Sequence, residues 1–271
     1  MKLKQRIVNI GKNIIPFEIR IFFRKLNWRR YYLQQIIFGE LSRTEVYCPI
    51  AKKSFKKFIK ISGDLVTPSN GARSRQRLVW HYLENELDIL TKNLRVLHIA
   101  PELSYLEILR KQKNLEYIPG DKMVQGYSNQ KGIKNVDLTQ IEFNNDCFDY
   151  IIANHVLEHI PNDKKAMTEM FRVLKNGGIG VVTVPINEKL DNTYEDSKII
   201  LPDDREKHFG QWDHLRLYGL DIKKRFEEVG FDVEMNRYYE KFSKEDYEKF
   251  GFCKDIIIVL RKTTATRANS Q

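Results

Sequence analysis

A group of ligand-binding and proton-exchanging residues follows one short apolar run of the chain. The run, residues 148–153, is rich in β-branched and aromatic residues, which predicts a strand buried on both faces. Asn154 and His155 come directly after it, and Glu158 and His159 follow shortly. In an open α/β sheet, ligands bind at the carboxyl ends of the strands. We therefore expect this stretch to lie at a ligand site, where imidazole and carboxylate groups can accept a proton.

Three earlier strand-like segments also end near an acidic residue. They are 95–100 with Glu102, 115–120 with Asp121, and 133–136 with Asp137. An acidic residue at the end of the second strand is placed to hydrogen-bond the ribose hydroxyls of a nucleotide-like cofactor, although the Gly-x-Gly that normally opens the first turn is missing. Each acidic residue alone is more often a helix cap or a turn residue. Their recurrence at successive strand ends favours a cofactor site.

The other elements complete an alternating α/β pattern. Further strands are expected over 179–184, 231–235 and 255–260, and helices over 78–90, 103–111, 164–174 and 222–229. Strands that alternate with helices predict a mostly parallel sheet with helices on both faces. Residues 186–218 have weak periodicity, and segments of this length in a compact domain are usually functional. We expect this segment to be a lid.

Positive charge is concentrated at the N-terminal end. Residues 1–77 hold 18 Lys and Arg against four Asp and Glu, a net charge of +14, whereas the other 194 residues sum to −4. Residues 1–45 predict a basic amphipathic helical extension. Two interpretations stay open: the extension lies on an anionic membrane with Phe22, Phe23 and Trp28 in the interface, or it packs on the rest of the protein or on a partner.

Composition excludes several classes of protein. The cysteines, Cys48, Cys147 and Cys253, are odd in number and widely spaced, so a reducing cytoplasm is expected. No apolar run reaches the roughly 20 residues of a membrane-spanning helix, and no secretory leader is recognisable. We expect a cytoplasmic protein, peripheral at the inner face of the membrane if residues 1–40 bind it.

The bridge, residues 46–94, begins like half of a zinc ribbon. Cys48 supplies one thiolate, but Ala51 stands where the second is needed, so we expect no metal there. Small hairpins are expected instead. Three arginines lead into the helix that follows: Arg73, Arg75 and Arg77. They either meet a substrate phosphate or form a solvated helix start.

Several of these stretches together resemble the class I S-adenosylmethionine-dependent methyltransferases. They are residues 96–102, 137–139, 148–159 and 171–178. The resemblance is to a bacterial branch similar to surface-polysaccharide-cluster methyltransferases, and it implies a Rossmann-like, mostly parallel seven-stranded sheet with helices on both faces. In that branch the bridge carries a four-cysteine knuckle, of which only Cys48 remains here. The chain is therefore expected to consist of the basic helical extension (1–45), the bridge (46–94), a methyltransferase domain (95–262) with the lid 186–218, and a flexible tail (263–271).

The resemblance also implies a set of residues around S-adenosylmethionine, the cofactor. They are Ala100 and Glu102 at its methionine end, Asp121 at the ribose, Asp137 and Leu138 at the adenine, and Asn154 with His155 under the sulfonium, with His98 as a further cofactor-binding residue. In the same branch a Gly-Gln-x-Asp-His-x-Arg-x-Tyr-Gly stretch occupies residues 210–219. The resemblance therefore implies a cap over the methyl acceptor, with Trp212, Arg216 and Tyr218 as substrate residues.

An oxygen acceptor must lose its proton as the methyl group is transferred. The first candidate for the base is His214, with Asp213 or Glu158 as alternatives, whereas His155 and His159 are more often pocket or core histidines. The stretch after Asn154 lacks the Pro-Pro-aromatic turn of enzymes that methylate amino groups, and Cys147 is poorly placed for a nucleophile in pyrimidine methylation.

The expected activity is methyl transfer to an oxygen of a sugar or lipid-linked glycan in bacterial surface-polysaccharide biosynthesis. Nucleic acid is not expected to be a partner. The alternative is a non-catalytic module that keeps the fold and binds RNA or a membrane-associated partner through its basic N-terminal region.

Overall fold

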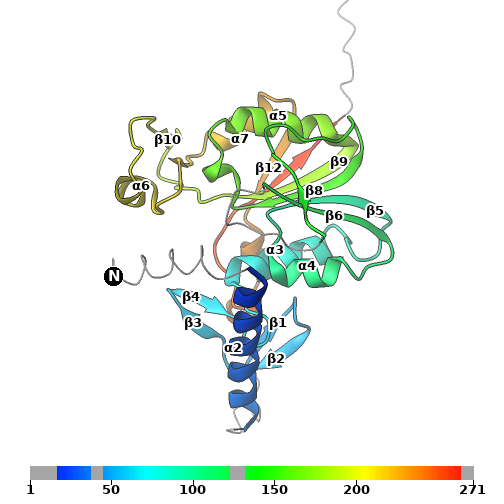
Figure 1. The fold of residues 1–271 in the computed structure, drawn as a ribbon, viewed down its shortest axis with the longest axis vertical. Coiled ribbons are helices and arrows are strands. Elements are labelled where there is room, and N and C mark those ends of the chain that lie inside the picture. Colours follow the sequence, from blue (N-terminus) through cyan, green and yellow to red (C-terminus); the bar gives the residue numbers. More distant parts are fainter. Residues whose placement is uncertain (1–16, 38–44, 123–131, 264–271) are drawn as a thin grey trace, which may run out of the picture.

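The centre of the computed structural model, which describes residues 17–37, 45–122 and 132–263, is a seven-stranded sheet (Figure 1). Its strands are β5 (Leu94–Ile99), β6 (Leu115–Asp121), β7 (Lys134–Asn135), β8 (Phe148–Asn154), β9 (Leu174–Thr183), β12 (Asp232–Asn236) and β13 (Ile257–Arg261). They lie in the order β12-β13-β9-β8-β5-β6-β7. Only β13 is antiparallel to its neighbours, β9 and β12. The expected mostly parallel sheet is confirmed.

Helices cover both faces of the sheet, as expected. α5 (Asp163–Val173) and α7 (Ile222–Glu227) lie on one face, and α3 (Ser74–Asn85) and α4 (Leu103–Leu109) lie on the other (Figure 1). Successive residues of one strand enter different cores: Ile151 of β8 packs in the core with α5, and Ile152 packs in the core with α3. Burial of both faces explains why these strands read as continuous apolar runs.

The direction in which strands are added to the sheet reverses between β5 and β8. From β5 the chain proceeds outward to β6 and β7, and it then returns to place β8 on the opposite side of β5. A reversal of this kind opens a crevice at the carboxyl ends of the strands. Ile99 of β5 pairs with both Gly120 and Ala153, so the three central strands end level with one another.

Two hairpins form the bridge, as the sequence predicted. They are β1 (Val46–Cys48) with β2 (Lys53–Phe55), and β3 (Ile59–Ile61) with β4 (Asp64–Val66). The buried Cys48 sulfur accepts hydrogen bonds from the Ala51 backbone N–H at 3.4 Å and the Thr67 hydroxyl at 3.2 Å. A hydrogen-bonded thiol therefore joins the turns that follow β1 and β4.

Arg77 corrects both interpretations of the bridge arginines, because it neither faces solvent nor is available to a phosphate. Arg77 belongs to α3, which begins at Ser74 rather than at the expected Leu78. Its side chain is fully buried. The guanidinium donates to the carbonyl oxygens of Leu65, Ala72, Phe250 and Gly251. It also lies 3.8 Å from the centre of the Phe58 ring. One side chain thus ties the bridge to a loop near the C-terminus.

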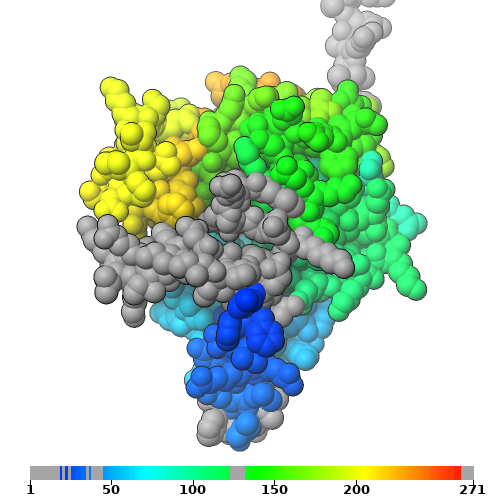
Figure 2. All heavy atoms as spheres, viewed as in Figure 1, coloured from blue at the N-terminus to red at the C-terminus, as the bar shows by residue number. Residues whose placement is uncertain are grey.

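α2 (Phe17–Ile37) lies against the bridge hairpins at one end of the molecule (Figures 1 and 2). Its Tyr32 ring packs on Phe55 at 5.9 Å, and Trp28 lies so close to Gly71 that a Cβ on this glycine would come within 2.6 Å of the indole. Trp28 therefore packs on the protein, which corrects its assignment to a membrane interface. Residues 1–16 and 38–44 of the predicted extension, and 264–271 of the predicted tail, lie outside the described residues.

Several elements differ from their predicted extents. α5 ends at Val173 and β9 begins at Leu174, so this strand begins well before the expected residue 179 and includes Gly177 and Gly178. The predicted lid contains β10 (Tyr194–Glu195), α6 (Pro202–Phe209) and β11 (Arg216–Leu217), and is therefore folded rather than an irregular loop. A short 3-10 helix, η1 (Leu157–His159), follows β8, and η2 (Tyr238–Lys241) and α8 (Lys244–Phe250) precede β13. In the described part of the chain, no helix has both the length and the apolarity needed to cross a membrane.

Replacement of Arg77 by lysine should destabilise the protein strongly. Lysine cannot reproduce the fork of donors, so buried carbonyl groups lose their partners while a charge stays buried, and we expect a loss of about 3–5 kcal/mol in the free energy of unfolding. Urea denaturation followed by circular dichroism measures this loss. Arg73→Lys, in an exposed ion pair with Asp64, is the matched control and should change stability by less than about 1 kcal/mol. Equal effects of the two substitutions would contradict the role assigned to Arg77.

Candidate active site

The end of β8 carries buried polar groups that are only partly satisfied. Asn154 Oδ1 accepts a hydrogen bond from the Thr183 hydroxyl of β9 at 3.1 Å, but its buried Nδ2 has no hydrogen-bond partner among the described residues. His155 has a φ of +53°, and its backbone N–H donates to the Thr183 carbonyl oxygen at 2.8 Å. A non-glycine residue in this left-handed region is uncommon, and strained residues of this kind cluster at active sites and ligand-binding turns.

The His155 ring lies between two carboxylates. Nδ1 is 3.1 Å from Glu158 Oε1, and Nε2 is 3.7 Å from Asp255 Oδ2, an ion-pair distance that is too long for a hydrogen bond. Burial by itself lowers the pKa of His155, but Asp255 and Glu158 raise it above its usual value of 6.5. The two carboxylates therefore offset the effect of burial on the pKa of the ring. Asp255 was not singled out in the sequence, where it only precedes the last strand.

At the end of β5, an alanine takes the backbone conformation of the missing glycine. Ala100 has a φ of +47°, in the region where glycine is normally favoured, and its N–H donates to the Gly120 carbonyl oxygen at 2.8 Å. His98 is fully buried, with Nδ1 2.8 Å from the Tyr117 hydroxyl and Nε2 2.9 Å from Glu102 Oε2. Because both ring nitrogens have protein partners, His98 orients Glu102 instead of offering a free nitrogen to the cofactor.

The ends of β6 and β7 bring Asp121 and Asp137 to the same edge of the sheet, where Val136 N–H donates to the Asp121 carbonyl oxygen. Asp137 Oδ1 accepts hydrogen bonds from the backbone N–H and hydroxyl of Thr139, and Oδ2 lies 2.7 Å from Lys122 Nζ. Partial burial by itself raises the pKa of Asp137. The interactions with Lys122 and Thr139 together outweigh this effect and lower the pKa to about 2. The Leu138 side chain is buried in the core, which leaves its backbone for the predicted contact with adenine.

Glu158, His159 and His214 form a cluster between η1 and the lid. One potential ligand atom from each of these residues lies within 4.8 Å of those of the other two. The two rings are 4.9 Å apart, edge to face, and burial lowers the pKa of His214, which therefore favours the neutral form. Asp213 lies beside the cluster, with Oδ2 3.7 Å from His159 Nδ1. The structure thus brings together all three residues proposed for the proton-transfer step, and it adds His159.

Arg216 and Tyr218 have a different role from the predicted contact with substrate. The Arg216 guanidinium is buried and donates to the carbonyl oxygens of Leu157, Ile160 and Pro161 and to the Glu195 carboxylate. The Tyr218 hydroxyl is also buried and donates to Asp163 Oδ2 at 2.9 Å. The Arg216 guanidinium and the Tyr218 hydroxyl are therefore hydrogen-bonded within the protein. Trp212, the third predicted substrate residue, is half-buried in the lid.

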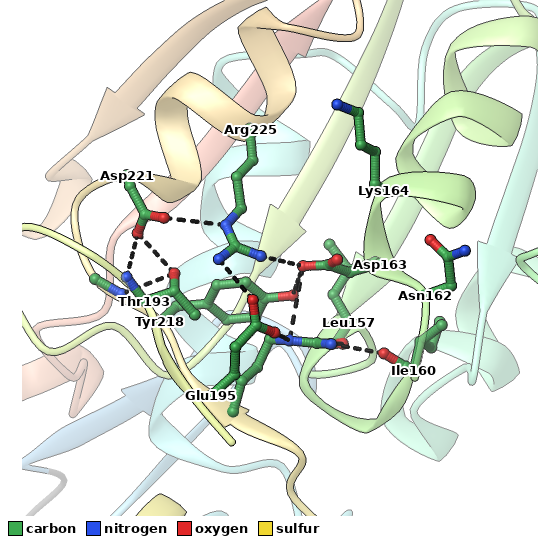
Figure 3. Close-up of polar contacts among 12 residues, drawn as sticks. Leu157, Ile160, Asn162, Asp163, Lys164, Thr193, Glu195, Tyr218, Asp221 and Arg225 are labelled. Atoms are coloured by element: carbon green, nitrogen blue, oxygen red, sulfur yellow. Dashed lines mark hydrogen bonds and ion pairs between the residues drawn. The ribbon is translucent and has the colours of Figure 1, made fainter. Parts of the chain in front are cut away.

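A network of charges fixes the lid to α5 and α7 (Figure 3). Arg225 of α7 binds Asp163 at 3.1 Å, Glu195 at 2.9 Å and Asp221 at 3.0 Å. Asp221 in turn accepts hydrogen bonds from the backbone N–H and the hydroxyl of Thr193. Since Glu195 and Thr193 belong to the lid, the network sets the position of the lid and therefore of His214.

Buried atoms without protein partners test whether the crevice suits S-adenosylmethionine. Within the described ranges, these atoms include Asn154 Nδ2, His155 Nε2, Glu158 Oε2 and Arg75 Nε. Three of the four belong to the last residue of β8 or to the few residues after it, where the resemblance implies the sulfonium end of the cofactor. Unpaired buried polar groups are costly, so they indicate a polar ligand. The end of β8 therefore fits a ligand that carries amino, carboxylate or hydroxyl groups.

Replacement of Arg216 by lysine should loosen the lid. Lysine cannot reach three carbonyl groups and a carboxylate at once, so we expect a loss of about 2–4 kcal/mol in the free energy of unfolding. Faster proteolysis within residues 186–218 should accompany this loss. Urea denaturation and limited trypsin digestion measure the two effects. Arg237→Lys, which keeps an exposed ion pair with Glu188, is the control, and equal proteolysis of the two variants would contradict the anchoring role.

Comparison with known proteins agrees with this geometry. Residues 104–182 match a family model described as a methyltransferase domain. A sterol 24-C-methyltransferase of Yarrowia lipolytica is 31% identical over 130 residues, which cover 46% of this chain and 32% of that protein. The chain thus spans about a third of the length of this curated relative.

Solved structures of other proteins align less closely. A cyclase, SpnF, aligns with a TM-score of 0.48 and 18% identity over 70% of this chain and 82% of its own. A phosphoethanolamine N-methyltransferase 2 of Haemonchus contortus, in complex with phosphomonomethylethanolamine and S-adenosylhomocysteine, aligns with a TM-score of 0.44 and 17% identity over 68% of this chain and 53% of its own.

The segment matched by the family model runs from α4 to β9 and contains the strand whose end bears the polar cluster. The seven-stranded sheet that contains this segment has a single antiparallel strand, β13, next to the edge strand β12. The sheet and its helices have a Rossmann-like methyltransferase fold.

Proposed function

We propose that the protein transfers a methyl group from S-adenosylmethionine to a hydroxyl oxygen of a polar acceptor, a sugar or a lipid-linked glycan. The observation that carries this proposal is the buried Glu158 carboxylate, one oxygen of which has no partner in the described chain, beside His159 and His214. This group adjoins His155, which the resemblance puts under the sulfonium. Proton-accepting side chains thus lie next to the expected position of the methyl group.

The reaction is a direct displacement. The acceptor oxygen forms a bond to the methyl carbon while the bond from that carbon to sulfur breaks, and S-adenosylhomocysteine leaves with a neutral sulfur. The hydroxyl proton passes to a basic group of the protein as the new bond forms. Most of the catalytic work is the alignment of donor and acceptor in a closed pocket. Anchoring of the lid by Arg216 and Arg225 suits that requirement.

A polar acceptor agrees with the chemistry of the cluster. The named curated relative acts on a sterol, which is almost entirely apolar, whereas imidazole and carboxylate groups of this chain converge under the lid. Buried groups of this kind favour a ligand with hydroxyl groups that can hydrogen-bond to them. The resemblance to surface-polysaccharide-cluster methyltransferases narrows the proposal to a sugar, and it favours a role in bacterial surface-polysaccharide biosynthesis.

Three residues are proposed for the proton-transfer step: Glu158, Asp213 and His214. Glu158→Gln and Asp213→Asn each preserve shape and remove a proton-accepting charge, so we expect kcat to fall by about 100-fold or more while the affinity for S-adenosylmethionine changes little. Calorimetry with the cofactor measures the affinity, and mass spectrometry of a sugar acceptor detects the methyl group as a gain of about 14 Da, one CH₂. Glu227→Gln, on the exposed side of α7, is the control.

The same measurements distinguish the proposal from its alternative. A folded protein that binds no S-adenosylmethionine would favour the non-catalytic module that binds RNA or a membrane-associated partner. Unchanged kcat in both variants would remove Glu158 and Asp213 from the proton-transfer step.

A second proposal concerns the membrane and rests on one face of α2. Apolar side chains recur there at helical spacing and face solvent: Ile19, Phe22, Phe23, Leu26, Leu33 and Ile37, with Ile37 73% and Phe22 61% exposed. Trp28 and Tyr32 occupy the opposite side and pack on the bridge. Exposed Arg29 and Arg30 lie in the same helix. An apolar face together with the +14 charge of residues 1–77 suits an anionic membrane, where a lipid-linked acceptor is found.

The membrane proposal predicts that the full-length protein sediments with phosphatidylglycerol vesicles and not with neutral phosphatidylcholine vesicles. Phe22→Glu combined with Phe23→Glu should reduce the bound fraction at least about tenfold, because two apolar anchors are replaced by charges that the vesicle repels. The matched control is Ile200→Glu with Leu201→Glu, an exposed apolar pair in the lid. Equal sedimentation of the two double variants would contradict the proposal.

A further inference from the structure

Glu158, His159 and His214 have the composition of a metal site. The two residues of η1 and the single residue of the lid each supply one potential ligand atom, and all three atoms lie within 4.8 Å of one another. We propose that these residues bind a divalent transition-metal ion. From the sequence we expected no metal, because only Cys48 of a zinc ribbon is present in the bridge. The ligands proposed here come from two segments, with His159 and His214 55 residues apart, which is not a recognised spacing.

The state of Glu158 is the first independent support. The residue is fully buried, and Oε1 lies 3.1 Å from His155 Nδ1. Oε2 is also buried but has no hydrogen-bond partner among the residues that the structure describes. A carboxylate oxygen that is removed from water and left unpaired costs free energy, and bound cations are one of the few groups that compensate for it. This unpaired oxygen belongs to Glu158, which lies beside His159 and His214.

The tautomers of the two histidines are the second support. His159 Nδ1 is 3.2 Å from the Asp213 carbonyl oxygen, and His214 Nδ1 is 3.1 Å from the Phe209 carbonyl oxygen. Because a carbonyl oxygen only accepts hydrogen bonds, Nδ1 must carry the proton in both rings. Nε2 of each ring then keeps its lone pair. Metal-bound histidines are typically held this way, with the other ring N–H donated to a carbonyl or carboxylate group.

The ligand types indicate the class of ion. Two imidazole nitrogens and one carboxylate suit zinc and its neighbours in the first transition series, whereas magnesium and calcium prefer oxygen ligands alone. Ligands at about 2.1 Å from a tetrahedral ion are about 3.4 Å apart, so ligand atoms that are separated by up to 4.8 Å need to move closer together. With three protein ligands, at least one coordination position remains for a further group, as in catalytic zinc sites.

This inference rests on the proposed function for its catalytic meaning. The open position would bind the acceptor hydroxyl, and the charge of the ion would favour loss of its proton. Glu158 and His214 would then be occupied as ligands, which leaves Asp213 as the proton acceptor among the three proposed residues. Its Oδ1 accepts a hydrogen bond from Gln211 at 2.7 Å, and its Oδ2 faces His159 at 3.7 Å. The proton moves from the hydroxyl to Asp213 while the methyl group moves from sulfur to oxygen.

Metal binding is tested on the full-length protein after treatment with EDTA. Titration with Zn²⁺ by calorimetry, and with Co²⁺ by visible absorption, should give one ion per chain. Glu158→Gln preserves the shape of the side chain, and His159→Ala removes a side chain that is 32% exposed, so both variants are suited to fold. Each should weaken binding by more than the roughly 10- to 100-fold that loss of an outer-shell partner costs.

Two controls and the cofactor separate the possible outcomes. His208→Ala removes another histidine of the lid, which contacts Tyr194, and Asp213→Asn removes the neighbouring carboxylate; both should retain the ion. A folded protein that binds S-adenosylmethionine but no Zn²⁺ or Co²⁺, or that binds only Mg²⁺, overturns the metal site and leaves the proposed function intact. Stoichiometric binding that depends on Glu158 and His159 supports the site even if no hydroxyl acceptor is methylated, and in that case the proposed function fails instead.

Discussion

One constraint shapes this protein: a strand paired on both edges and covered on both faces can carry ligand-binding groups only where it ends. β8 lies between β5 and β9, and its side chains alternate between two apolar cores. Polar side chains within that strand would have to find partners in a dry interior. The first place where they reach a crevice is Asn154 and His155. The turn there is formed by a non-glycine residue at positive φ, and such strain persists where surrounding structure holds it.

The polar site is completed by the lid, and buried charges hold the lid in place. Asp163 lies at the start of α5 and receives Arg225 of α7 and the Tyr218 hydroxyl, while Arg216 caps three carbonyl groups around η1. Burying ions is costly, and well-packed apolar residues are often as stable. An ion network contributes specificity of position instead, because its directional hydrogen bonds are all formed in only one arrangement of the segments. Here that arrangement brings His214 against His159.

The N-terminal half is joined to the sheet by comparable means. Arg77 connects the hairpins of the bridge to carbonyl groups 173 and 174 residues later in the chain. Cys48 and Thr67 join the two turns of the bridge by a hydrogen bond. Small hairpins rarely hold together alone, and a buried guanidinium with a full set of acceptors supplies the missing cross-link. α2 packs on this bridge through one face and leaves the other exposed.

The sequence by itself determined the sheet, the helices on both faces and the edge at which the site lies. These follow from local patterns: short apolar runs rich in β-branched and aromatic residues, such as residues 148–153, favour buried strands, and the polar residues after them then lie at strand ends. It could not determine the partners of individual polar side chains. Nothing in the order of residues reveals that Arg77 is buried, or that Asp255 faces His155.

Only the tertiary structure decided which residues of the lid contribute to the polar cluster and which anchor the lid to the rest of the protein. Arg216, Tyr218 and His214 lie within one short motif, yet the first two bond to protein groups and the third turns toward Glu158 and His159. The physical reason is that this choice depends on contacts between segments far apart in the chain. Side-chain direction in a segment without regular periodicity is set by those contacts and not by local preference.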